Sequence, residues 1–191
     1  MTAGFSLTDC ITERMIHMES HNRLVLLNGP SSAGKSSVAE QLRQKMALCG
    51  ADAVIISIDD YMKVAEDEEI WEDDVFEIMP DMCRDITPAL QQGKWVIVDH
   101  VITSPRIYEV LLAAAAGFGV TAVLVTCSLE ILKKREKERG NRFIGSAEAS
   151  YQYLYPREGY DLRIDSGENS PEVSAEKILD FLRDVTSTSS F

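Results

Sequence analysis

The segment Gly29–Ser36 has residue types and a spacing that suit phosphate binding. It reads Gly-Pro-Ser-Ser-Ala-Gly-Lys-Ser, which fits the pattern G-x-x-x-x-G-K-[ST]. In such a loop the backbone N–H groups surround a β-phosphate, Lys35 reaches the β/γ oxygens, and the Ser36 hydroxyl ligates Mg²⁺. The predicted binding residues are Gly29, Pro30, Ser31, Ser32, Ala33, Gly34, Lys35, Ser36 and the adjoining Ser37. The sequence therefore predicts a site for a phosphorylated ligand together with Mg²⁺.

Three acidic residues follow apolar runs and are expected to lie at the same rim as this loop. Asp99 ends one run, and a carboxylate in that place holds Mg²⁺ directly or through water, although it could instead cap a turn or helix. Asp59 and Asp60 end another run. A carboxylate there can accept a proton from a hydroxyl that attacks a γ-phosphate, whereas one of the pair can instead cap a helix beginning at Tyr61.

Three arginines form a further group that could act on phosphate. Arg135 and Arg139 are four residues apart on one predicted helical face, and Arg142 follows shortly after them. Guanidinium groups on a closing lid would stabilise the charge that spreads over a phosphoryl group during transfer. The alternative is a solvated helix face, because Glu136 and Glu138 are interleaved with the basic residues.

Strand and helix patterns alternate along the chain that must position these groups. Near-continuous apolar runs predict strands over 24–28, 54–58, 95–99 and 120–127, with a shorter and more polar edge strand over 161–165. Helical spacing predicts helices over 36–46, 86–92, 104–116, 129–139 and 172–185. This order predicts an α/β protein with three layers, α/β/α, in which helices cover both faces of a five-stranded, mostly parallel sheet of the P-loop NTPase type.

The charge and the composition of the chain limit the classes of molecule that it is expected to bind. The 191 residues carry a formal net charge of −12, from 31 acidic and 19 basic side chains. Nucleic acid is disfavoured because phosphate backbones select basic surfaces, and a neutral or cationic small molecule fits better. The cysteines at positions 10, 49, 83 and 127 are too widely spaced for a metal site. No stretch resembles a membrane span or a signal peptide, so we expect a cytoplasmic protein with no membrane partner.

Several motifs together resemble one known family. Residues 27–36, the aspartate after the second predicted strand, the run 97–99, the arginine motif 135–142 and the later segment 160–165 are similar to the chloramphenicol phosphotransferase-like P-loop kinases. The resemblance implies a fold of the small-kinase type and an enzyme that uses Mg²⁺ and ATP to phosphorylate an alcohol group of a small molecule. It also implies that the aspartate in question, Asp59, is the catalytic base.

Small P-loop kinases carry a lid after the fourth strand, which assigns expected roles to the basic residues. We expect Lys35, Arg139 and Arg142 to act in catalysis and Arg135 to support the loop or the adenine of ATP. The expected organisation is an N-terminal extension over 1–22, a kinase domain over 23–185 with its lid near 135–157, and a flexible tail over 186–191. The sequence does not indicate an oligomeric state.

The segment expected to bind the acceptor departs from the family pattern because it is acidic, above all over residues 66–77. This segment either favours a cationic acceptor or forms a solvated lid surface. Tyr61, Trp71 and Phe76 either line an aromatic pocket or pack the core. A nucleoside, nucleotide or protein hydroxyl is an alternative acceptor. A nucleotide-dependent switch or ATPase is the non-kinase alternative, although the guanine-reading Asn-Lys-x-Asp motif of GTPases is absent.

Overall fold

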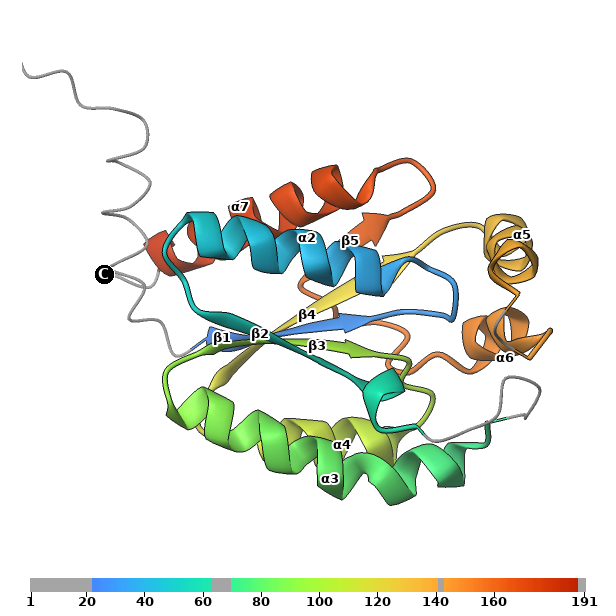
Figure 1. Cartoon of the computed structure of the whole chain (residues 1–191), viewed down its shortest axis with the longest axis horizontal. Helices are drawn as coiled ribbons and strands as arrows, with labels where there is room; N and C mark the ends of the chain where they lie inside the picture. The colour runs from blue at the N-terminus through green and yellow to red at the C-terminus, as the bar shows by residue number, and fades with distance from the viewer. Residues whose placement is uncertain (1–21, 63–69, 141–142, 189–191) are drawn as a thin grey trace, which may run out of the picture.

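A five-stranded, wholly parallel sheet runs through the centre of the molecule (Figure 1). The computed structural model describes residues 22–62, 70–140 and 143–188. The strands are arranged in the order β2-β3-β1-β4-β5. Their bounds are β1 Asn22–Asn28, β2 Ala53–Ser57, β3 Trp95–His100, β4 Gly119–Thr126 and β5 Leu162–Asp165. The predicted strands are therefore confirmed to within two residues, and the short fifth strand does lie at a sheet edge.

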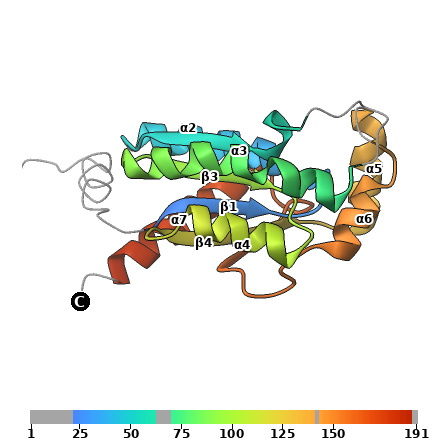
Figure 2. The same ribbon diagram turned by 90° about the horizontal axis from the view of Figure 1, so that it is seen from below.

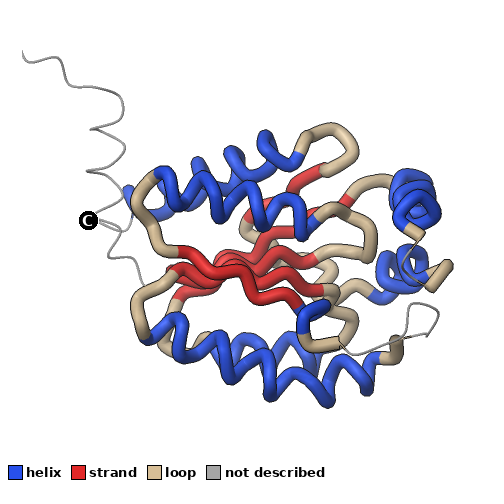
Figure 3. The backbone as a smooth tube through the Cα atoms, viewed as in Figure 1, coloured by secondary structure: helices blue, strands red, loops and turns tan. Residues whose placement is uncertain are grey.

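Helices cover both faces of the sheet, which makes the predicted three layers (Figures 1 and 3). Helices α2 and α7 lie on one face, and α3 and α4 lie on the other. Helices α5 and α6 stand together at the end of the molecule toward which the strands point (Figure 2). The bounds are α2 Lys35–Leu48, α3 Glu72–Gln91, α4 Pro105–Ala114, α5 Leu129–Arg139, α6 Ser146–Tyr153 and α7 Pro171–Thr188. None of the helices in these described ranges combines the length and the apolar character that crossing a membrane requires.

Alternate side chains of the central strands enter two separate cores. Val25 and Leu27 of β1 pack in the cluster that contains α2 and α7, whereas Leu24 and Leu26 pack against α3 and α4. All four are fully buried. A strand that is buried on both faces requires a continuous apolar run, and this explains why β1 could be predicted from the sequence.

The parallel register brings the carboxyl ends of three neighbouring strands to one rim. Leu27 at the end of β1 pairs with Asp99 on β3, and Ser57 at the end of β2 pairs with the same aspartate. The residues that follow β1 and β2 therefore emerge on either side of Asp99. This is the edge at which open α/β sheets bind their ligands.

Two local predictions need correction, and one helix was missed. Helix α3 begins at Glu72, well before the predicted start at 86, and it contains Pro80 and Pro88. No helix begins at Tyr61, because a single 3₁₀ turn, η1 (Ile58–Asp60), follows β2 instead. Helix α6 was not predicted at all. By contrast, the predicted C-terminal end of α5 at Gly140 is confirmed, with a left-handed backbone at that glycine.

Candidate active site

The predicted phosphate-binding loop connects the end of β1 to the start of α2. Gly29 lies so close to β4 that a Cβ atom added to it would be 1.9 Å from the carbonyl oxygen of Val125, so only glycine fits there. Gly34 has a left-handed backbone, with φ of 87°, at the N-terminal cap of α2. Because this helix begins at Lys35, its unpaired N–H groups and positive dipole end face the loop.

Lys35 is held inside this loop. Only 6% of it is exposed, and its Nζ donates a hydrogen bond of 3.0 Å to the carbonyl oxygen of Pro30. The same carbonyl accepts a hydrogen bond of 3.3 Å from the backbone N–H of Ala33. The loop therefore curls around the lysine side chain, as a phosphate cradle requires.

The two residues predicted to ligate Mg²⁺ lie next to each other. The Ser36 hydroxyl donates a hydrogen bond of 2.6 Å to Oδ2 of Asp99, although 63 residues separate them in the sequence. Asp99 is 4% exposed and therefore has a defined position on β3. Serine and carboxylate oxygens are the hard ligands that Mg²⁺ prefers. Within the described ranges no group of three or more His, Cys, Asp or Glu side chains is arranged to hold a metal, so phosphate and water oxygens would have to complete the coordination.

The geometry separates the two aspartates that follow β2. Both lie on η1 and both are exposed, but Asp59 lines the cavity described below and Asp60 does not. The turn is attached to α3 by the next residue, Tyr61, whose hydroxyl donates a hydrogen bond to Asp85. Partial burial and this hydrogen bond raise the pKa of Tyr61 above its ordinary value, so the phenol keeps its proton. Asp59 thus comes from an anchored turn.

The predicted arginines have different surroundings. Arg135 donates hydrogen bonds to the carbonyl oxygen and the hydroxyl of Ser166, at 2.8 and 3.2 Å, and its Nη1 lies 3.9 Å from where a Cβ on Gly34 would be. It therefore joins the loop after β5 to the phosphate-binding loop. Arg139 is exposed and lines the cavity. Arg142 lies outside the described residues.

Helix α6, within the predicted lid, is attached to both α5 and the phosphate-binding loop. Glu136 of α5 is 2% exposed and accepts hydrogen bonds from the backbone N–H groups of Gly145 (3.0 Å) and Ala147 (2.7 Å). These are N–H groups at the start of α6, which Glu136 therefore caps. Four residues from that start, the Ser150 hydroxyl accepts a hydrogen bond of 2.9 Å from the N–H of Ser31.

The loop, Asp59, Asp99 and the segment predicted to form the lid surround one cavity of about 910 Å³. Polar groups that line it include Lys35, Ser36, Asp59, Asp99 and Arg139. The cavity also has an apolar wall near Asp59. That wall consists of Ile58, Met62, Ile70, Trp71, Val75 and Val101.

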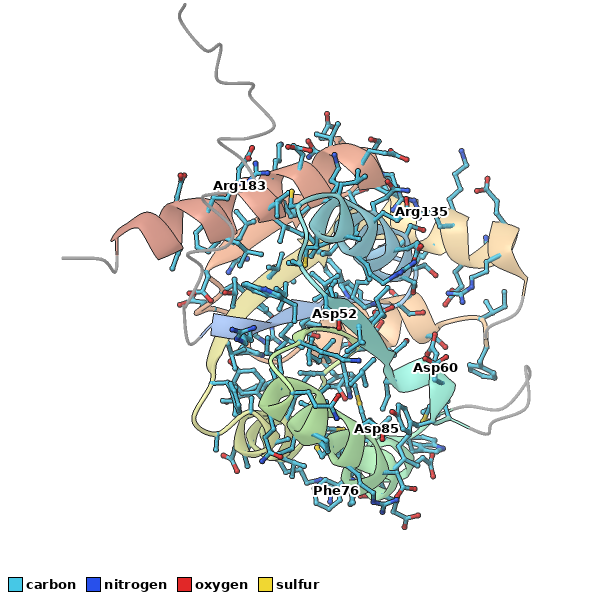
Figure 4. All side chains as sticks on the ribbon, turned by 60° about the vertical axis from the view of Figure 1, so that its left-hand side comes forward. Asp52, Asp60, Phe76, Asp85, Arg135 and Arg183 are labelled. Carbon is cyan, nitrogen blue, oxygen red and sulfur yellow. The ribbon has the colours of Figure 1, made fainter. Side chains whose placement is uncertain are left out.

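The three aromatic residues that were predicted either to line a pocket or to pack the core have different surroundings. Trp71 lines the cavity and is 64% exposed. Tyr61 is bonded to Asp85, as described, and Phe76 lies on α3 (Figure 4). The guanidinium of Arg106 lies 4.2 Å from the centre of the Phe76 ring. Both Tyr61 and Phe76 are half-buried and pack against the core beside α3 and α4, as the second alternative predicted. Only Trp71 among them therefore contributes to a pocket. On the opposite side, the lid segment adds Phe143 and Tyr153 to the lining.

Part of the acidic segment is neutralised within the protein. Arg106 on α4 forms ion pairs with Glu72 and Asp73 at the start of α3. The hydrogen bonds from Arg106 are the main reason why the pKa of Glu72 is below its ordinary value. Residues 66–69, which carry the other acidic side chains at the start of this segment, lie outside the described ranges.

Asn28, at the end of β1, is a buried junction between three loops. Its Oδ1 accepts hydrogen bonds of 2.9 Å from the N–H groups of Gly29 and Ile102. Its Nδ2 donates to the carbonyl oxygen of Tyr155 (2.8 Å) and to the hydroxyl of Tyr160 (2.7 Å). All four hydrogen-bonding positions of the amide are satisfied. One side chain thus fixes the start of the phosphate-binding loop, the loop after β3 and the segment that follows α6.

His100, directly after Asp99, is fully buried on the α3 side of the sheet. Its Nε2 lies 3.4 Å from the sulfur of Met79. Burial lowers its pKa from 6.5 to about 4, with a smaller contribution in the same direction from Lys35. The imidazole is therefore neutral at physiological pH.

The roles of Ser150, Glu136 and Asn28 were not predicted from the sequence. Asn28 did belong to the motif that carried the family resemblance, and it was the strongest available signal. In the sequence, Glu136 is one of several charged residues on α5, and nothing distinguishes it from the others. For Ser150 the available hint was a run without glycine or proline from 146 to 155, which permits a helix but does not indicate its contacts.

Comparisons with known proteins place this site in context. The family model for chloramphenicol phosphotransferase-like proteins matches residues 22–183. No curated protein matches the chain. Among solved structures, the APS kinase CysC of Mycobacterium tuberculosis in complex with AMPPNP and APS has 20% identity and a TM-score of 0.69, over 85% of this chain and 98% of that one.

Two further solved structures share the fold. A gluconokinase from Sinorhizobium meliloti has 20% identity and a TM-score of 0.67, over 89% of this chain and 97% of that one. The shikimate kinase of Acinetobacter baumannii, in complex with shikimate, has 19% identity and a TM-score of 0.59, over 89% and 96%. Family and fold together support a small-molecule P-loop kinase. The chain therefore belongs to the chloramphenicol phosphotransferase-like family.

Proposed function

We propose that this protein is an ATP-dependent phosphotransferase that phosphorylates a hydroxyl group of a small molecule. The observation that carries the proposal is the shared cavity, in which Asp59 lies on an anchored turn beside the phosphate-binding loop and the pair of Ser36 with Asp99. A hydroxyl kinase needs a base, a phosphate cradle and a metal site within one space. An ATPase or switch would not require an apolar wall beside the base.

The residues near the metal site fit Mg²⁺. Ser36 and Asp99 would hold the ion, because their oxygens already lie 2.6 Å apart and one of them carries charge. When bound, Mg²⁺ supplies positive charge that offsets the negative charge on the phosphate oxygens. We propose that the loop from Gly29 to Ser37 binds the phosphates of ATP and that Arg135 supports the loop or the adenine.

The chain's own side chains account for the chemical step. Asp59 accepts the proton of the acceptor hydroxyl as its oxygen forms a bond to the γ-phosphorus, and the bond between that phosphorus and the β,γ-bridging oxygen breaks. Lys35 stabilises the charge that develops on the departing β-phosphate oxygens. Arg139 and Arg142 stabilise the charge on the transferred group from the lid.

The acceptor side of the cavity favours a molecule with an apolar body and no negative charge. The wall around Asp59 is made of aliphatic, thioether and indole side chains. Among the described lining residues, the charged side chains on this side are Asp59 and Glu72, and Glu72 is paired with Arg106 of α4. Lys35, Arg135 and Arg139 are the basic residues in the described lining, and they belong to the loop and the lid. A carboxylate or sulfate on the acceptor would meet no basic side chain among the described residues of this wall.

The decisive experiment measures ADP release from Mg-ATP with a panel of neutral, cationic and anionic alcohols. We expect turnover with neutral or cationic apolar alcohols, and we expect Asp59→Asn to lower kcat by about 10²- to 10⁴-fold with little change in the KM for ATP. Asp60→Asn is the matched control, because this neighbour is also exposed but does not line the cavity. Wild-type turnover by Asp59→Asn, or loss of ATP binding in that variant, would contradict the assignment of the base.

A further inference from the structure

The Pro30–Ser31 peptide of the phosphate-binding loop is held on both sides. Its carbonyl oxygen, on Pro30, accepts the hydrogen bond of 3.0 Å from Nζ of Lys35. Its N–H, on Ser31, donates the hydrogen bond of 2.9 Å to the hydroxyl of Ser150. The C=O and N–H of a peptide lie in one rigid plane, so neither can turn without the other. The contact at Ser31 therefore also sets where the lysine finds its acceptor.

The Ser150 hydroxyl is suited to this task because its single proton is engaged elsewhere. Its Oγ lies 2.6 Å from the carbonyl oxygen of Ser146, to which it donates, and 3.2 Å from that of Ala147. A hydroxyl oxygen that donates its proton still has lone pairs to accept a hydrogen bond. Ser150 is 7% exposed, so water has little access to replace it at the Ser31 N–H.

The helix that carries Ser150 is itself fixed against α5. Glu136 caps its first turn through Gly145 and Ala147, as described, and Lys133 of α5 forms an ion pair of 2.8 Å with Glu148 of α6. These contacts fix the rotation of α6 about its own axis and its position along α5. Ser150 therefore approaches Ser31 from a defined place, and the lid and the loop share one orientation.

We infer that Ser150 is a positioning residue that orients the Pro30–Ser31 peptide and, through it, the Lys35 ammonium. The inference rests on the proposed binding of ATP by this loop, and it assigns to the lid a part in shaping the phosphate cradle. Its consequence is selective. Loss of the Ser150 hydroxyl should weaken the binding of ligands that have β- and γ-phosphates, which Lys35 reaches, and leave the binding of a monophosphate unchanged.

The test compares the dissociation constants of Mg·AMPPNP and of AMP for the wild type and for Ser150→Ala. We expect Ser150→Ala to weaken Mg·AMPPNP about fivefold, which corresponds to the loss of one hydrogen bond worth about 1 kcal/mol. AMP should bind to the variant within about twofold of the wild type. Ser150→Thr, which keeps the hydroxyl, should restore the binding of Mg·AMPPNP.

Ser174→Ala is the matched control. Ser174 is a fully buried helical serine whose hydroxyl donates to the carbonyl oxygen four residues earlier, at 2.8 Å, as Ser150 does, but it lies on α7 and does not line the cavity. Its loss should lower the melting temperature without changing the binding of either nucleotide. Unchanged Mg·AMPPNP binding in Ser150→Ala, equal weakening of AMP, or a folded Ser150→Thr as weak as Ser150→Ala would each overturn the inference. A wild type that binds no Mg·AMPPNP would overturn the proposed function as well.

Discussion

Replacement of His100 by leucine should change how the stability of this protein depends on pH. Burial lowers the pKa of His100 in the folded chain from 6.5 to about 4, and the backbone of Val101 and, less strongly, the charge of Asp59 oppose this only in part. Between these two values the unfolded chain binds a proton that the folded chain does not. The free energy of unfolding of the wild type therefore falls as the pH decreases through this window, and His100 contributes no pH dependence above about pH 7.

The size of the effect follows from the two pKa values. Each pH unit below 6.5 costs about 1.4 kcal/mol until the folded protein also takes up the proton near pH 4. Over the whole window the loss amounts to about 3 kcal/mol. Between pH 7.5 and pH 5, where only the unfolded chain binds the proton, it amounts to about 2 kcal/mol.

Urea unfolding at several pH values, followed by circular dichroism, measures this directly. The quantity of interest is the difference in free energy of unfolding between the wild type and His100→Leu at each pH. The acidic side chains titrate in both proteins, so their contribution cancels in this difference. We expect the difference to shift by about 2 kcal/mol in favour of the variant from pH 7.5 to pH 5. A difference that stays constant over this range would refute the claim that buried His100 is neutral.

Two other substitutions test the loop and the metal site. Gly29→Ala should destabilise the protein by about 3 kcal/mol or more, because its Cβ would lie 1.9 Å from the Val125 carbonyl oxygen. Gly117→Ala, where nothing lies within 4 Å, should cost only about 1 kcal/mol of backbone strain, and similar melting temperatures for the two variants would contradict this account. Asp99→Asn can still accept the hydrogen bond from Ser36 but lacks the negative charge that binds Mg²⁺. In the wild type, AMPPNP should bind more tightly with Mg²⁺ than with EDTA, and the variant should reduce this gain in affinity by at least about tenfold. An unchanged gain, measured by calorimetry, would show that Asp99 does not serve the metal.

The sheet could be predicted because each central strand is a short, uninterrupted apolar run. Strands β1 and β3 are covered on both faces, so their side chains have no polar alternation to obscure the pattern. The phosphate-binding loop could also be predicted, because its glycines and lysine form one contiguous pattern, although the contact with Val125 that requires glycine at position 29 could not. The order of these elements then placed the aspartates at one rim.

The length of α3 could not be predicted because two local signals oppose it. Pro80 and Pro88 each remove a helical N–H and normally interrupt a helix, at a cost of about 3 kcal/mol. Met79, Met82, Ile86 and Leu90 nevertheless share one buried face at helical spacing, and their packing against the sheet outweighs that cost. Tertiary contacts decided the structure here.

Helix α6, within the predicted lid, could not be predicted for a different reason. Helix α6 is short and largely exposed, and it has little apolar periodicity of its own. Its position depends on Glu136 and on the contact between Ser150 and Ser31, which are single polar pairs between distant segments. No residue type marks such a pair in a sequence. The candidate site could thus be predicted as a set of residues, whereas the contacts that orient them could not.

The four hydrogen bonds of Asn28 have a consequence for how the chain folds. Three of them join residues that are 74, 127 and 132 positions away in the sequence. Contacts of such long range carry a large loop-closure cost and slow the formation of the structure they complete. During synthesis the phosphate-binding loop emerges early, but its anchor is complete only after Tyr160 has left the ribosome. Competence to bind nucleotide should therefore appear late, as one of the final events of folding.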